Sequence, residues 1–186
     1  MSAPHLRNPG DDALRQEWGT VVDNELRLDR EAATRIVEAL NADLSGLYIL
    51  FNQLRKHYWT LEGAEVRPVV EFLEDAADRL SEATDEIAIR VHALGGVPVN
   101  GPMGIRQHAP MHIEGAAVYA LRASLENDLE AYAILVAQLR EHIELAAEIG
   151  DETTVEILRE HLRTIEEDAH DVEKFLADDT LVRMDD

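Results

Sequence analysis

The most direct chemical signal in the chain is a carboxylate and an imidazole three residues apart, in Glu167-Asp-Ala-His170. Residues at that spacing share one face of a helix and could bind one metal ion together. Bundles that hold two iron ions inside one chain use two such Glu-x-x-His pairs, plus a Glu from each of the other two helices. The second pair is missing here, because Ile89 stands three residues before His92. We therefore expect no diiron site inside the bundle and interpret His170 as a hydrogen-bonded histidine.

Four long amphipathic segments must position any functional side chain. Apolar residues recur in them at helical spacing. Asp29 and Asp151 are suitable N-caps, Pro68 suits a first helical turn, and Gly95-Gly96 and Gly150 are stop signals. The expected helices run from Asp29 to about Leu61, from Pro68 to Leu94, from about Ile113 to Glu148, and from Asp151 to Leu176.

A long loop separates the second and third helices. Residues 95–111 contain three of the six prolines and four of the ten glycines. Short, long and short connections in that order predict an all-α, ferritin-like four-helix bundle with a long crossover between helices 2 and 3. We expect an N-terminal extension over residues 1–28, the bundle over residues 29–178 and a C-terminal tail over residues 179–186. We detect no internal repeat.

The charge balance is strongly acidic. Asp and Glu total 38 against 17 Lys and Arg, a net charge of −21, and only Lys56 and Lys174 are lysines. This composition resembles that of halophilic proteins from salt-saturated cytoplasm. So anionic a surface repels phosphate backbones, and the first thirty residues hold six acids beside four arginines, so direct DNA binding is not expected.

Simple observations also exclude several kinds of site and several locations. The chain has no cysteine, which excludes disulfides and thiolate metal sites. No apolar run approaches the roughly 20 residues that cross a membrane. The N-terminus also lacks the apolar core of a secretory signal. We expect a cytoplasmic protein with no membrane contact.

Several stretches resemble the Dps family of miniferritins, and its haloarchaeal members in particular. They are Trp59-Thr-Leu-Glu-Gly63, Asp85-Glu-Ile-Ala-Ile-Arg90, Ala93-Leu-Gly-Gly-Val-Pro98, Glu141-His-Ile-Glu-Leu145, Gly150-Asp151 and Glu167-Asp-Ala-His170. The likeness covers about residues 28–182. It implies a homo-oligomeric shell, a dodecamer built from two-fold dimers, that stores iron and limits oxidative stress. It also implies a ferroxidase site between two chains.

The Dps motif implies which positions bind iron, and three of them have changed. Tyr58 stands where the family has a His before the Trp, Val70 where it has a second His, and Ile89 where it has a bridging Glu. Glu74 and Asp85 match the remaining acids. These two lie about 16 Å apart along one helix at 1.5 Å per residue, so one ion can touch both only when two copies of the helix pack antiparallel.

Glu74 and Asp85 alone hold a divalent cation weakly and do not favour iron over magnesium or manganese. His57 is one residue from a missing ligand, but a one-residue step turns a helical side chain by about 100°, so we expect it to point elsewhere. Tyr58 could bind ferric iron as a phenolate, although an ordinary tyrosine is neutral near pH 7. Alternatively, Tyr58, Val70 and Ile89 form an apolar dimer contact against which Trp59 simply packs.

Two acidic rows match further features of Dps shells. Glu152 and Glu156 fall at the acidic positions of the three-fold pore, within a row of glutamates four apart: Glu144, Glu148, Glu152, Glu156 and Glu160. A second row corresponds to the mineral-nucleating inner surface: Glu71, Asp75, Asp78, Glu82 and Glu86. Either row also fits an ordinary solvated helix face. His108 and His112 could share a metal only if the third helix extended back through Pro110.

We predict a Dps-like shell that binds and sequesters iron or other divalent cations, with weak or absent ferroxidase activity. The alternative is a fully active ferroxidase and iron-storage protein that oxidises Fe²⁺ with O₂ or peroxide at a rearranged inter-subunit site. Haem-bearing storage would need a methionine on the dimer-facing helix. The four methionines fall outside the expected helix interiors: Met1, Met103, Met111 and Met184.

Overall fold

The computed structural model describes residues 11–63 and 66–177, so the predicted limits of the N-terminal extension and the C-terminal tail lie partly outside the described residues. These ranges contain helices and no strand. The helices are the short 3-10 turn η1 Asp11–Ala13, α1 Arg30–Thr60, α2 Val66–Ala93, α3 Pro102–His108, α4 Leu121–Ile149 and α5 Glu152–Leu176. No described helix is long and apolar enough to span a membrane.

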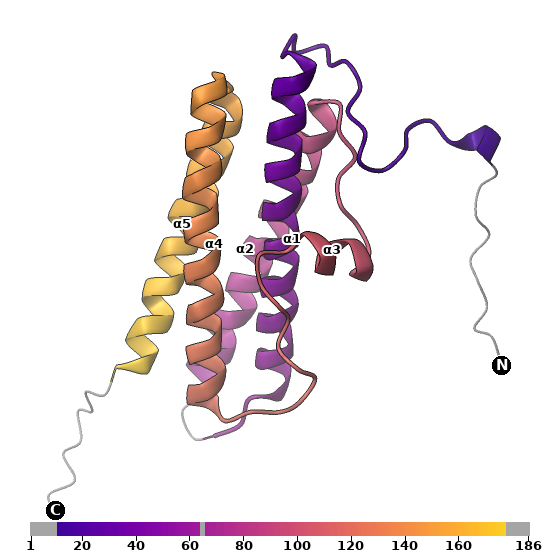
Figure 1. Cartoon of the computed structure of the whole chain (residues 1–186). Coiled ribbons are helices and arrows are strands. Elements are labelled where there is room, and N and C mark those ends of the chain that lie inside the picture. Colours follow the sequence, from indigo (N-terminus) through magenta and orange to yellow (C-terminus); the bar gives the residue numbers. More distant parts are fainter. Residues whose placement is uncertain (1–10, 64–65, 178–186) are drawn as a thin grey trace, which may run out of the picture.

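The four long helices form two hairpins packed side by side, α1 with α2 and α4 with α5 (Figure 1). The segment between α2 and α4 carries α3 against α1 (Figure 1). Five leucines of α1 are completely buried at the centre: Leu40, Leu44, Leu47, Leu50 and Leu54. The predicted all-α, ferritin-like bundle with a crossover after its second helix is confirmed.

The helix ends follow the predicted capping residues. The Asp29 carboxylate accepts the backbone N–H groups of Glu31 and Ala32 at 2.9 and 3.3 Å, and the Asp151 carboxylate accepts that of Thr154 at 3.1 Å. Gly150 ends α4 at φ +85°, a backbone conformation that costs a side-chain-bearing residue more than it costs glycine.

The predicted start of the third long helix was wrong. We expected it at about Ile113, but α4 begins at Leu121. Lys56 donates to the Gly115 carbonyl at 3.0 Å and also contacts the Glu114 carboxylate, so this stretch is tied to α1. Apolar spacing alone cannot reveal such a tie. The sequence also missed α3, whose first turn contains Met103, so that methionine does lie in a short helix outside the bundle.

Candidate metal centre on α2

The residues of α2 that the resemblance to Dps implies as ligand positions lie on its outward face. Glu74 and Asp85 are exposed, Val70 is half-buried, and the side chain of Ile89 is 72% exposed. The opposite face is buried in the bundle, through residues such as Leu73. In the described part of the chain, no three His, Asp or Glu side chains converge to hold a metal ion. One chain by itself therefore does not complete a site here.

Tyr58 and Trp59 lie at the end of α1. Tyr58 is half-buried, and its ring meets that of Trp59 edge-on at 5.8 Å. The Arg55 guanidinium lies 4.7 Å from the centre of the Trp59 ring. Trp59 is 62% exposed in the single chain, so its packing in a dimer contact stays a prediction. The proposed apolar dimer contact of Tyr58, Val70 and Ile89 stays a prediction.

His57 points into the bundle, away from Glu74 and Asp85. Only 1% of its side chain is exposed. Its Nδ1 lies 2.8 Å from the Asp128 carboxylate and its Nε2 lies 2.9 Å from that of Glu114. Burial disfavours the charged imidazole, but the hydrogen bonds and charges of these two carboxylates outweigh it and raise the pKa of His57. Both ring nitrogens are thus engaged, so the metal-binding role considered for His57 is not available in this arrangement.

The partners of His57 were missed by the sequence analysis. Asp128 of α4 is fully buried and also accepts a hydrogen bond from Gln53 at 2.8 Å. Glu114 of the crossover accepts from Lys56 and Asn127. A signal for Asp128 was present, because it is an acid within the buried, apolar row of α4. A buried carboxylate needs such partners to offset its desolvation.

The Glu167 and His170 side chains are exposed on the outer side of α5. His170 Nδ1 lies 3.3 Å from the Glu173 carboxylate, as expected for a hydrogen-bonded histidine. The residue of this segment that turns inward is Asp168, which pairs with Arg79 of α2 at 2.6 Å. The Glu-x-x-His spacing therefore lies on the wrong face of α5 to reach the bundle interior.

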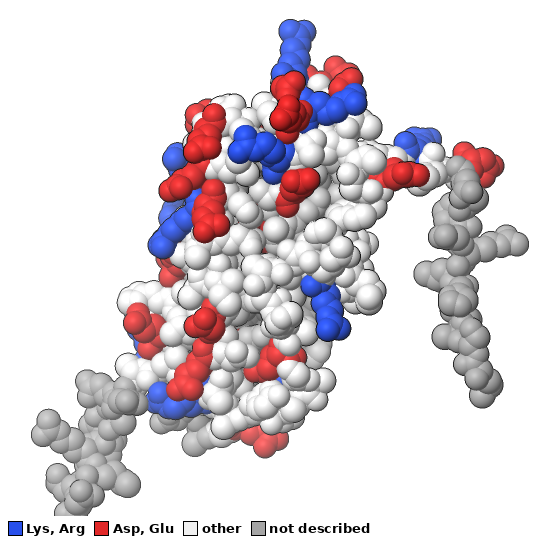
Figure 2. All heavy atoms as spheres, in the orientation of Figure 1, with Lys and Arg blue, Asp and Glu red and all other residues white. Residues whose placement is uncertain are grey.

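Both acidic rows are exposed along their helices. None of the five glutamates in the row from Glu144 to Glu160 has a hydrogen-bond or ion-pair partner through its side chain within the described residues. In the row on α2, Glu71 pairs with Arg67 and Glu86 with His161. Figure 2 shows acidic side chains on the upper and lower parts of the visible face, with a broad neutral area between them. Both rows are solvated in the single chain.

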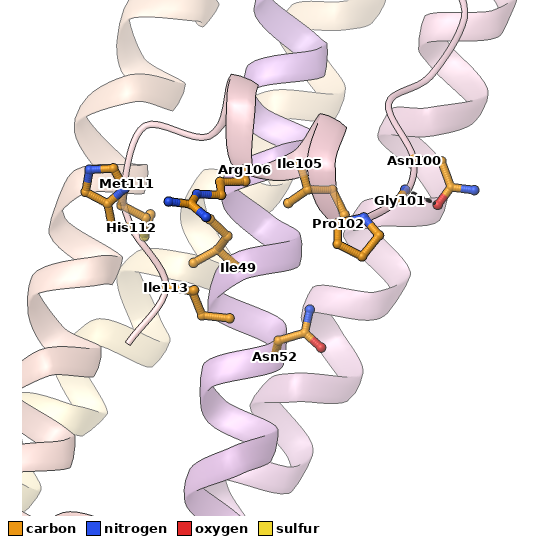
Figure 3. A pocket seen from close by; sticks show the side chains of 10 residues that line it. All are labelled: Ile49, Asn52, Asn100, Gly101, Pro102, Ile105, Arg106, Met111, His112 and Ile113. Atoms are coloured by element: carbon orange, nitrogen blue, oxygen red, sulfur yellow. Dashed lines mark hydrogen bonds between the residues drawn. The ribbon is translucent and has the colours of Figure 1, made fainter. Parts of the chain in front are cut away.

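An open groove of roughly 620 Å³ lies between α1 and the crossover (Figure 3). Its walls are largely apolar, and Arg106 and His112 stand along one side. His108 lies instead at the end of α3, with its ring 5.6 Å from that of Trp18. Because α3 ends at His108 and α4 begins only at Leu121, the two histidines do not share a helix face, so the condition set for their metal pair is not met.

Comparison with known proteins agrees with this architecture. Residues 37–182 match the ferritin-like domain family. The chain is 47% identical over 157 residues to the DNA protection during starvation protein of Halobacterium salinarum. This aligned stretch covers 84% of this chain and 86% of the relative. It is 32% identical over 168 residues to the nutrient stress-induced DNA-binding protein of a Synechococcus strain, covering 90% of this chain and 96% of the relative.

A solved structure gives the same result. The crystal structure of an archaeal Dps homologue from Halobacterium salinarum superposes with a TM-score of 0.90 at 44% identity, covering 94% of this chain and 97% of the other. The bundle with its crossover is thus a ferritin-like domain. Within that class, the chain belongs to the Dps family, as the sequence motifs indicated.

Proposed function

We propose that this chain assembles into a Dps-like shell, a dodecamer built from two-fold dimers, that binds and sequesters iron or other divalent cations. In this role it limits oxidative damage with weak or absent ferroxidase activity. The observation that carries the proposal is the outward face of α2. Glu74 and Asp85 are exposed there and can meet a second copy, but the apolar Ile89 occupies the position of the bridging acid.

The donor set that remains explains the expected weakness of the chemistry. Two carboxylates bind hard divalent cations through oxygen and leave most positions to water. Without imidazole or a bridging acid, nothing holds two iron ions together for a concerted transfer of electrons to O₂ or peroxide. Cation capture then depends on the acidic rows. Glu152 and Glu156 are exposed and have no side-chain partner among the described residues, which supports a role in cation uptake, and Glu71, Asp75, Asp78 and Glu82 support a role in retention.

The rate of ferrous oxidation tests the proposal. We expect aerobic Fe²⁺ added to the pure assembled protein to oxidise no faster than in a protein-free blank, with O₂ or with peroxide, as followed by ferric absorbance. Binding of Fe²⁺ under anaerobic conditions should still occur, and Glu152→Gln/Glu156→Gln should slow its uptake. Oxidation well above the blank would instead support the alternative, an active ferroxidase with a rearranged inter-subunit site.

DNA contact is expected to play no part in protection. The names of the two relatives refer to DNA, but a chain with a net charge of −21 must overcome strong repulsion from phosphates. We expect no retardation of duplex DNA by micromolar protein in a gel shift at low salt, where electrostatic binding is strongest. A retarded band that weakens with added salt would contradict this expectation.

A further inference from the structure

The two hairpins of the bundle carry the same buried polar motif, which the sequence analysis did not detect as a repeat. In α1 the motif is Asp43, Gln53 and His57, and in α4 it is Asp128, Gln138 and His142. Each residue of the second set lies 85 positions after its counterpart. The same offset relates buried core residues of both hairpins: Leu40 and Leu125, Leu50 and Leu135, Leu54 and Leu139, Leu73 and Leu158, and Leu80 and Ile165.

Each aspartate binds the Gln and His of the other helix, so the motif forms two equivalent clusters between α1 and α4. Asp128 accepts from Gln53 at 2.8 Å and lies 2.8 Å from Nδ1 of His57. Asp43 accepts from Gln138 at 2.7 Å and lies 2.7 Å from Nδ1 of His142. Both aspartates are completely buried. The arrangement has the approximate two-fold symmetry expected of two related hairpins.

The clusters differ at the second ring nitrogen. Nε2 of His57 is closed off by Glu114 of the crossover. Nε2 of His142 has no partner within the described residues and is not sealed from solvent, since 19% of that side chain is exposed. The chain crosses from one hairpin to the other only once, so no equivalent of Glu114 covers the second cluster. His142 therefore presents one open nitrogen at the surface between α1 and α4.

Electrostatics indicates what this open position favours. The residue before His57 is Lys56, whose ammonium group pairs with Glu114. The equivalent residue next to His142 is Glu141, an acid. The negative charges of Glu141 and Asp43 both favour a positive charge at His142. One Asp43 oxygen, Oδ2, is also buried without a hydrogen-bond partner. Two acids in a chain of net charge −21 disfavour an anion there and favour a cation.

We propose that His142 binds a divalent transition-metal ion of the Zn²⁺ or Co²⁺ class through Nε2, with Asp43 fixing the imidazole from behind and Glu141 adding negative charge beside it. A histidine that ligates a metal commonly donates its other ring N–H to a carboxylate, which sets the tautomer and strengthens the ligand. An imidazole donor also selects such ions over Mg²⁺ and Ca²⁺. Because no group of three His, Asp or Glu side chains converges in the described part of the chain, water fills the remaining positions and the ion stays exchangeable.

Proton competition limits the site at low pH. Burial disfavours the charged imidazole of His142, but the hydrogen bond and charge of Asp43 and the charge of Glu141 raise its pKa. Binding displaces the proton from Nε2, so the apparent affinity should fall as the pH drops below neutrality. Neither assembly nor iron oxidation is required, because every residue involved belongs to one chain.

Anomalous diffraction from crystals of the full chain soaked in CoCl₂ or ZnCl₂ tests the site. We expect a peak about 2.1 Å from Nε2 of His142. In calorimetric Zn²⁺ titrations, His142→Gln should lose one site per chain. Asp43→Asn, which keeps the imidazole, should bind about 10–100-fold more weakly. His170→Gln is the matched control, because His170 is an exposed histidine beside a glutamate with no buried aspartate behind it.

Two results would overturn the proposal: no metal peak at His142, or a Zn²⁺ stoichiometry and affinity that His142→Gln leaves unchanged. If circular dichroism shows that Asp43→Asn does not fold, His142→Gln carries the test alone. The His142 side chain is partly exposed, and this substitution removes only the ligand. A negative result here leaves the ferrous oxidation assay unaffected, so the failure of either proposal can be told from the other.

Discussion

The triple variant Tyr58→His, Val70→His, Ile89→Glu is expected to oxidise ferrous iron at least about tenfold faster than the wild-type protein. The changes return two imidazoles and a bridging carboxylate to positions that already adjoin Glu74 and Asp85 in the Dps motif. Even a residue that only supports a ligand commonly changes metal affinity by about 10–100-fold, so three restored ligands should have a large effect. Stopped-flow ferric absorbance with O₂ and with peroxide measures the gain.

The single changes provide the control for this experiment. Ile89→Glu alone should give little activity, because an isolated bridging acid without imidazole does not hold two iron ions. The new glutamate costs little stability in the free chain, where Ile89 is 72% exposed. If the triple variant assembles normally and still matches the blank, the three replaced positions are not the reason for weak oxidation.

Arg90→Ala is expected to destabilise the fold by about 3 kcal/mol, the low end for breaking a buried ion pair. The Arg90 guanidinium lies 2.5 Å from Asp151, and the two side chains are 11% and 5% exposed. It also donates to the Thr154 hydroxyl at 2.9 Å. The substitution would leave the buried carboxylate that caps α5 without its cation. The midpoint of thermal unfolding should fall by about 6–12 °C at fixed protein concentration.

The effect of Arg90→Ala should depend on pH. Burial by itself would raise the pKa of Asp151, but hydrogen bonds from Arg90 and Thr154 hold that pKa below its usual value of about 3.9. A pKa that is lower in the folded state than in the unfolded chain stabilises the fold at pH values above the unfolded-state pKa. This contribution is lost as the pH falls through the folded-state pKa. The gap between wild type and Arg90→Ala should therefore shrink below about pH 4.

Arg67→Ala on the same helix is the matched control. Arg67 also pairs with an acid, Glu71, but the two side chains are 87% and 64% exposed. Exposed pairs contribute at most about 1 kcal/mol, so this change should barely move the midpoint. If Arg67→Ala and Arg90→Ala lowered the midpoint of thermal unfolding equally, burial of the Arg90–Asp151 pair would not be the cause of its stabilising effect.

The helices and their caps were predictable because their signals are local. Asp29, Asp151 and Gly150 act on backbone groups within a few residues, and the apolar rows of α1 and α2 reflect the helix period alone. The start of α4 was not predictable, because the Lys56 contacts with residues 114 and 115 join segments almost sixty positions apart. The predicted dimer contact of Trp59 depends on a second chain, and in the single chain its side chain is 62% exposed.

By itself, the amino-acid sequence determined the four-helix architecture and the acidic surface, because residue types and short spacings specify these directly. The replacement of three ligand positions is what the resemblance to the Dps motif implies, and it stays a prediction. Only the tertiary structure decided which polar side chains meet. It placed His57 inward between Asp128 and Glu114, turned Glu167 and His170 outward, and showed that Asp43 with His142 repeats the cluster of Asp128 with His57. Those contacts depend on the register of α1 against α4, which is set by packing along the whole interface. Each helix alone shows only that polar residues fall within its buried apolar row, and not which of them meet.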